Sequence, residues 1–137
     1  MTCNKTALSN LTPGDGLTIQ IRYLARRKFV APAFVVSISD RFGSEIVRLS
    51  TMPISGYYIE KIDGKGVVEL CIDRLPLTGG KYFISVEMTR PNVESIFRLE
   101  RFIVLTVTPT DVYGSGLELD NSKGLLVLKH SWNHLAI

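Results

Sequence analysis

Two runs of alternating apolar and polar residues between Gly66 and Arg90 give the strongest pattern in the chain. Successive side chains of a β-strand point to opposite faces, so this alternation predicts two strands, each with one buried face. The inward residues are Val68, Leu70 and Ile72 in the first run, and Tyr82, Ile84, Val86 and Met88 in the second. The outer face of the second run would carry Phe83, Ser85, Glu87 and Thr89.

Four further segments, at residues 17–24, 33–40, 45–50 and 97–109, also have strand-like patterns. Asp40-Arg41-Phe42-Gly43 predicts a hairpin turn, because glycine accepts the positive φ of tight turns. Residues 51–65 have no regular pattern, and we expect them to be irregular. The expected core positions of the strands are Leu17, Ile19, Ile21, Tyr23, Phe34, Val36, Ile38, Phe102 and Val104.

This assignment leaves three apolar residues, Ile103, Leu105 and Val107, on the other face of the last segment. Outward apolar residues on a strand need cover from another strand or from a partner chain. The β-prone segment 124–130 is the candidate, and the long connection 110–123 would let it reach either position.

Short strands separated by turn signals, with no helical pattern, predict an all-β fold. We expect an immunoglobulin-like antiparallel β-sandwich, with strands 33–40, 44–50, 81–90 and 98–108 in one sheet. The 137 residues are enough for one core, so residues 1–137 are expected to form a single domain.

The charge pattern is mild, with a formal net charge of +3 at pH 7. We expect Arg26-Arg27-Lys28 to form a solvated loop, with binding of an anion such as phosphate as the alternative. No RNA-binding signature accompanies these residues, so nucleic acid is not an expected partner. The chain has no apolar run near the roughly 18 residues of a membrane span, and no signal peptide at its start.

The two cysteines, Cys3 and Cys71, lie far apart in the sequence. Two free thiols suit a reducing compartment, and a disulfide between them is the less favoured alternative.

Metal-binding patterns are weak. His130 and His134 follow a β-prone run, where four-residue spacing would not bring them together on zinc. The oxygen-rich residues Asp111, Glu118 and Asp120 do not have the spacing of a calcium loop. We therefore expect no metal site and no cofactor.

Catalytic patterns are also weak. The chain lacks a Gly-x-x-x-x-Gly-Lys-Ser/Thr loop, so it does not hydrolyse nucleotides by that route. Glu69 and Glu87 both point outward but are expected on different sheets, which disfavours a glycosidase pair. We expect a protein that is not an enzyme.

One predicted sheet face combines hydroxyl, charged and aromatic side chains. This mixture suits a sugar, because polar groups hydrogen-bond its hydroxyls and an aromatic ring packs on its C–H face. An ordinary solvated face has the same composition, so that alternative stays open. The candidate carbohydrate-binding residues are Ser37, Ser39, Arg48, Phe83, Ser85 and Glu87.

An ordered set of short motifs resembles a known family. The segments are 34–40 with Phe42-Gly43, then 75–86, then 102–104, then Asp111-Val112-Tyr113-Gly114-Ser115-Gly116, and finally 126–128 with His130-Ser131-Trp132. In this order they resemble the C-terminal carbohydrate-binding domain of Wzt-type ATP-binding subunits, from ABC transporters that export O-antigen polysaccharide. The turn Gly79-Gly80 departs from the usual Pro-Gly.

The resemblance implies an immunoglobulin-like domain that binds the end of a polysaccharide and confers substrate recognition on the exporter. It also implies a cytoplasmic location at the inner membrane, through an ATP-binding domain and a transmembrane channel subunit. Homodimers that exchange the C-terminal strand are implied as well, with residues 124–137 as that strand. The alternative function is a structural or protein-interaction sandwich that mediates dimerisation.

Overall fold

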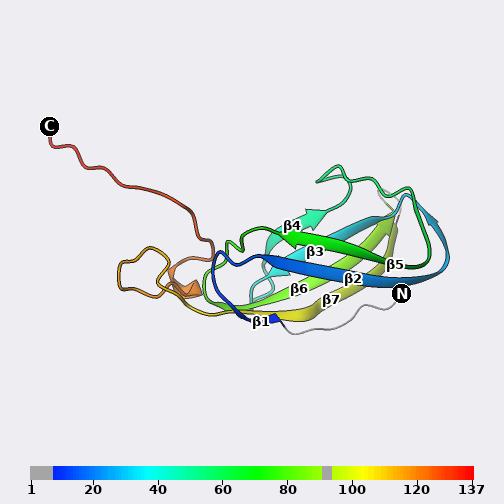
Figure 1. Ribbon diagram of the computed structural model, residues 1–137, viewed down its shortest axis with the longest axis horizontal. Coiled ribbons are helices and arrows are strands. Elements are labelled where there is room, and N and C mark those ends of the chain that lie inside the picture. The colour runs from blue at the N-terminus through cyan, green and yellow to red at the C-terminus, as the bar shows by residue number, and fades with distance from the viewer. Residues whose placement is uncertain (1–7, 91–93) are drawn as a thin grey trace.

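The computed structural model describes residues 8–90 and 94–137, and it confirms an all-β sandwich (Figure 1). One sheet has five strands in the order β1-β7-β6-β3-β4, and the other contains β2 and β5. The strands are β1 (Leu8–Leu11), β2 (Leu17–Val30), β3 (Ala33–Ser39), β4 (Glu45–Ser50), β5 (Lys61–Ile72), β6 (Gly80–Arg90) and β7 (Glu94–Val107). The helical element of the described residues is a 3-10 turn, η1 (Asn121–Lys123). Residues 8–90 and 94–137 contain no helix with the length and apolar character that a membrane span needs.

The core lies between the two sheets, and the predicted alternation accounts for most of it. Tyr82, Ile84, Val86 and Met88 of β6 are all buried, opposite Ile19 and Ile21 of β2 in the same cluster. Fully burying one such side chain contributes about 1.5–3 kcal/mol, so these residues dominate the stability of the sandwich. The predicted grouping of β3, β4, β6 and β7 in one sheet is confirmed.

The basic cluster is part of a strand, so the prediction of a loop there is wrong. Arg26, Arg27 and Lys28 lie within β2, whose partner β5 begins at Lys61 inside the segment expected to be irregular. The register shifts between Ala25 and Phe29, and this bulge lets all three basic side chains stay exposed. Because β2 pairs with β5 on both sides of the cluster, these charged residues remain within a strand.

The predicted phase of β7 is also wrong. Ile103, Leu105 and Val107 are buried in the core, whereas Phe102 and Val104 are half-buried. Residues 102–105 are apolar at every position, so alternation cannot set the phase of this run. Pairing with β6 sets it, because Leu105 lies opposite the buried Tyr82.

A bulge in β7 accompanies this register. Val86 pairs with Leu99 and Ile84 pairs with Ile103, so β7 has extra residues between these two pairs. Arg101, within the bulge, has a positive φ of 48°. The three residues expected to form a bare apolar face therefore face the core and need no partner chain to cover them.

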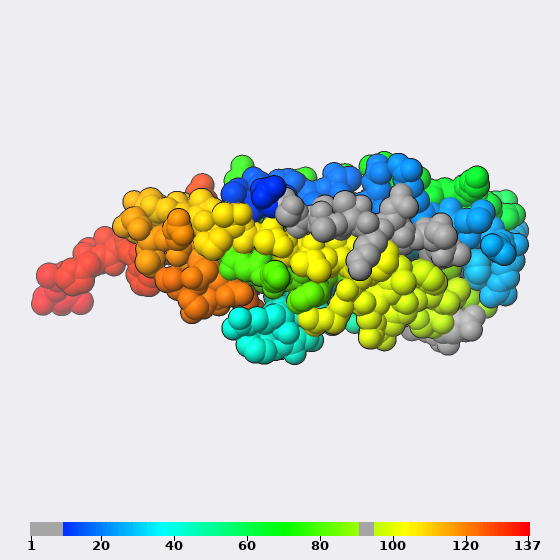
Figure 2. All heavy atoms as spheres, turned by 90° about the horizontal axis from the view of Figure 1, so that it is seen from below, coloured from blue at the N-terminus to red at the C-terminus, as the bar shows by residue number. Residues whose placement is uncertain are grey.

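The C-terminal segment 124–137 makes only a short contact with the sandwich. Leu126 forms an isolated bridge with Leu77, and the Val127 N–H donates to the Pro76 carbonyl at 2.6 Å. Residues 128–137 are exposed and extend away from one end of the molecule (Figures 1 and 2). The β-prone tail thus does not add a regular strand to its own chain in the described structure.

Tyr82 ties this end of the sandwich together. Its hydroxyl donates to the Thr78 carbonyl at 2.7 Å, an arrangement like the tyrosine corner of immunoglobulin-type sandwiches. The Thr78 hydroxyl donates in turn to the Gly124 carbonyl at 2.7 Å. Burial raises the pKa of Tyr82, which keeps the phenol protonated as a donor at neutral pH.

Replacing Tyr82 with phenylalanine removes the hydroxyl and leaves the buried ring in place. We expect a loss of about 1–2 kcal/mol in the free energy of unfolding, measured by urea denaturation, because the Thr78 carbonyl loses its donor. Tyr57→Phe is the matched control, since the Tyr57 side chain is exposed, and it should change stability by less than about 0.5 kcal/mol. Equal effects of the two substitutions would contradict this role.

Neighbouring alanine substitutions test the phase of β7. Leu105→Ala should cost about 2–5 kcal/mol because it leaves a cavity in the core, whereas Val104→Ala should cost about 1 kcal/mol or less. Urea denaturation of both variants would measure these losses in the free energy of unfolding. The reverse order would restore the phase predicted from the sequence.

Candidate functional site

The outer face of the five-stranded sheet brings the predicted sugar-binding residues together. Ser37 of β3 lies opposite Ser85 of β6 and Arg48 of β4, and Ser39 lies opposite Phe83. Glu87 pairs with Val35, one step further along the same two strands. We call this set (Ser37, Ser39, Arg48, Phe83, Ser85 and Glu87) the outer face.

Two arginines on or beside the outer face form ion pairs with glutamates. The Arg48 Nε lies 2.8 Å from the Glu45 Oε1, and the Arg98 Nη2 lies 2.8 Å from the Glu100 Oε1. The hydrogen bond that Arg48 donates to Glu45 raises the pKa of Arg48, with a smaller contribution from the charge of Glu87. The charges of these two arginines are therefore balanced by carboxylates.

Phe83 does not present a bare ring to solvent. The guanidinium carbon of Arg101 lies 3.8 Å from the centre of its ring, in a cation–π contact. The Arg101 N–H donates to the Ser85 Oγ at 2.8 Å, and the Ser39 hydroxyl donates to the Phe83 carbonyl at 3.4 Å. Arg101 therefore belongs to the site, although nothing in the alternation of β7 identified it.

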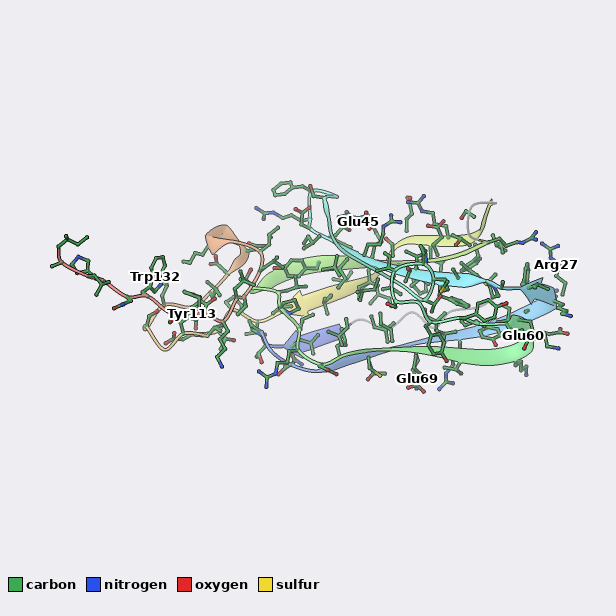
Figure 3. All side chains as sticks on the ribbon, turned by 90° about the horizontal axis from the view of Figure 1, so that it is seen from above. Arg27, Glu45, Glu60, Glu69, Tyr113 and Trp132 are labelled. Atoms are coloured by element: carbon green, nitrogen blue, oxygen red, sulfur yellow. The ribbon has the colours of Figure 1, made fainter. Side chains whose placement is uncertain are left out.

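The two outward glutamates considered for catalysis lie on different layers. Glu69 is on β5 and Glu87 on β6, so they belong to opposite sheets as predicted. Figure 3 shows Glu69 projecting from one side of the sandwich and Glu45 from the other. The sandwich thus separates Glu69 from the outer face.

A cavity lies between the layers, where the edge strand β4 faces β5. It has a volume of about 640 Å³ and is lined mostly by apolar side chains such as Phe34, Leu49, Ile59 and Leu70. Tyr57 also lines it, whereas the neighbouring Tyr58 is absent from its lining. We call this feature the interlayer groove. It arises because the two-stranded sheet is narrower than the five-stranded one.

The aspartates of the connection 110–123 accept hydrogen bonds from nearby groups of the same connection. The Asp111 carboxylate accepts from the Ser115 and Gly116 N–H groups at 3.0 and 2.9 Å. Asp120 accepts from the Ser122 N–H and hydroxyl, bonds that lower the pKa of Asp120. Within residues 8–90 and 94–137, no three His, Cys, Asp or Glu side chains form a group that could hold a metal ion.

Aromatic side chains gather where the tail leaves the body. Tyr113 contacts His130 edge-on at 4.9 Å between ring centres, and His130 contacts Trp132 at 5.9 Å. The Tyr113 hydroxyl donates to the Leu128 carbonyl at 3.0 Å (Figure 3 labels Tyr113 and Trp132). Cys71 is a free, exposed thiol, while Cys3 lies outside the described residues.

Comparison with known proteins gives one consistent answer. A family model described as the Wzt C-terminal domain matches residues 2–118. A solved structure titled "Crystal structure of the C-terminal domain of wzt" matches with a TM-score of 0.74 and 16% sequence identity, over 91% of this chain and 73% of that chain. At that identity the likeness shows a shared fold. The comparison with curated proteins gives no match.

The family model covers most of the chain, and the structural match agrees with it. The resemblance drawn from the sequence motifs is thereby confirmed. This chain belongs to the Wzt C-terminal domain family, and it is a domain of the Wzt type of ABC transporter.

Proposed function

We propose that this domain binds the end of an O-antigen polysaccharide, without catalysis, and so gives an ABC exporter its substrate recognition. The observation that carries the proposal is the register of β3, β4 and β6, which gathers hydroxyl, carboxylate and guanidinium groups on one sheet face. Such groups hydrogen-bond sugar hydroxyls. Membership of the Wzt C-terminal domain family supports the transporter context.

The partners that follow from this proposal are the ATP-binding domain and the transmembrane channel subunit of the exporter. The domain would then work on the cytoplasmic side of the inner membrane, where it meets the glycan before export. It would hold the polysaccharide by hydrogen bonds and by contact with rigid side chains, with modest affinity for each sugar.

A double variant of the outer face tests this proposal. Ser37→Ala with Glu87→Gln removes a hydroxyl and a charge, and we expect binding of the source strain's polysaccharide to weaken about tenfold or more. Calorimetry or amide chemical shifts in titrations of the 137-residue chain would measure the effect.

The matched control is Thr18→Ala with Glu69→Gln, which makes the same chemical changes on exposed residues of the two-stranded sheet. It should leave binding unchanged. The proposal fails if the unaltered chain does not bind the polysaccharide, or if both double variants weaken binding equally.

A second function, dimerisation through the tail, is favoured by a separate observation. Trp132 and Leu135 are 91% and 76% exposed, which is costly for apolar side chains of an extended segment. Within the described residues β5 pairs only with β2, and the interlayer groove beside it is apolar. We propose that the tail of one copy contacts the other copy and forms a homodimer.

Ending the chain after Leu128 tests the role of the tail, because this removes residues 129–137, with the exposed Trp132 and Leu135, and keeps the contacts of 125–128 with the body. We expect a dimer for the whole chain and a monomer for the shortened one, by light scattering. Polysaccharide binding should persist in the monomer. A dimer that survives the shortening, or a whole chain that is monomeric, would contradict this proposal.

A further inference from the structure

Arg101 crosses the outer face from the bulge of β7. Its backbone is held by the hydrogen bond from its N–H to Ser85, and its guanidinium lies over Phe83. The Arg101 Nη1 reaches towards the β3–β4 turn, at 3.5 Å from the Asp40 carbonyl. The guanidinium is therefore held at a defined place among the candidate sugar-binding residues, although the residue is exposed.

Its charge is not balanced as its neighbours' charges are. Arg48 is paired with Glu45 and Arg98 with Glu100, but Arg101 forms no ion pair within the described part of the chain. The hydrogen bond to Asp40 is long and uses one of five N–H donors. A planar guanidinium with free donors matches a carboxylate or a phosphate, which it can bind through two parallel hydrogen bonds.

We infer that Arg101 recognises a negatively charged group on the bound glycan, a carboxylate or a phosphate. The inference rests on the proposed function and narrows its substrate to acidic glycans. Phe83 then acts mainly as the platform that positions Arg101, and not as a bare ring against which a sugar stacks. Ser85 positions the same residue through its hydroxyl, and Ser37 lies beside Ser85 to meet neighbouring sugar hydroxyls.

Three small probes separate charge from sugar shape: methyl glucoside, methyl glucuronide and glucose 1-phosphate. They supply a neutral sugar, a carboxylate and a phosphate. We expect at least one anionic probe to shift the NMR signals of the Arg101 Nε–H and of the Ser85 and Phe83 amides at millimolar concentration. The neutral probe should leave these signals in place.

Arg101→Asn is the informative variant, because asparagine tolerates the positive φ of this position and carries no charge. It should abolish the response to the anionic probes, while a dispersed spectrum shows that the fold is kept. Arg101→Lys keeps the charge without the planar fork and should weaken binding several-fold. Arg98→Gln lowers the net charge equally but removes a paired arginine, and it should not change the response.

The inference is overturned if no anionic probe shifts these signals, if the neutral probe shifts them equally, or if Arg101→Asn responds like the unaltered chain. An equal loss in Arg98→Gln also overturns it, since general charge would then suffice. If the polysaccharide binds the outer face while the anionic probes fail, this inference falls alone. If the polysaccharide does not bind at all, the proposed function falls with it.

Discussion

The pairing of β6 with β3 on one side and β7 on the other is the constraint on which the rest of the molecule depends. Side chains alternate with a period of two, so a slip of one residue would expose Ile84 and Val86 and bury Ser85 and Glu87. Each apolar side chain moved into water would cost about 1.5–3 kcal/mol, and each buried polar group without a partner would add to that cost. The core therefore sets the outer face: the energy that holds Tyr82 and Ile84 inside also fixes which groups a ligand can meet.

The bulge in β7 preserves this strand pairing at a local energetic cost. Extra residues between Leu99 and Ile103 keep apolar side chains facing inward on both sides of the bulge. A left-handed backbone at a residue such as Arg101 costs roughly 1–2 kcal/mol. The hydrogen bond to Ser85 and the contact with Phe83 offset part of that cost. Bulges often redirect a side chain beside a functional site, and here the redirected side chain is that of Arg101, which has no ion pair among residues 8–90 and 94–137.

Sequence patterns predicted those parts of the fold in which apolar and polar residues alternate without ambiguity. Residues 17–23 have this property throughout, and Ser37, Ser85 and Glu87 mark the outward positions of residues 34–38 and 82–88. The inward positions of all three segments were assigned correctly. Residues 102–105 are apolar at every position, so only the partner strand sets their phase. The charge of the cluster 26–28 predicts a loop, but β2 pairs with β5 on both sides of the cluster, and that long-range pairing is not visible in the local sequence. The outer face followed from alternation, but Arg101 could not, since its position depends on a bulge that forms only when β7 meets β6.

The two sheets differ in their number of strands, five and two. The proposed glycan-binding face and the proposed dimer contacts therefore lie in different parts of the molecule. The outer face belongs to the five-stranded sheet alone. The interlayer groove lies between the two sheets, and the tail leaves one end of the sandwich (Figure 1). A partner copy whose contacts were confined to the tail and the interlayer groove would leave both outer faces open. Two faces in one assembly matter because a single sugar site binds weakly, and a linked pair of sites can raise the overall affinity for a repetitive polymer by orders of magnitude. That gain requires two binding ends or repeats on the glycan within reach of both faces. A ligand recognised only at one chain end would gain little, so the dependence of affinity on dimerisation separates recognition of an end from recognition of a repeat.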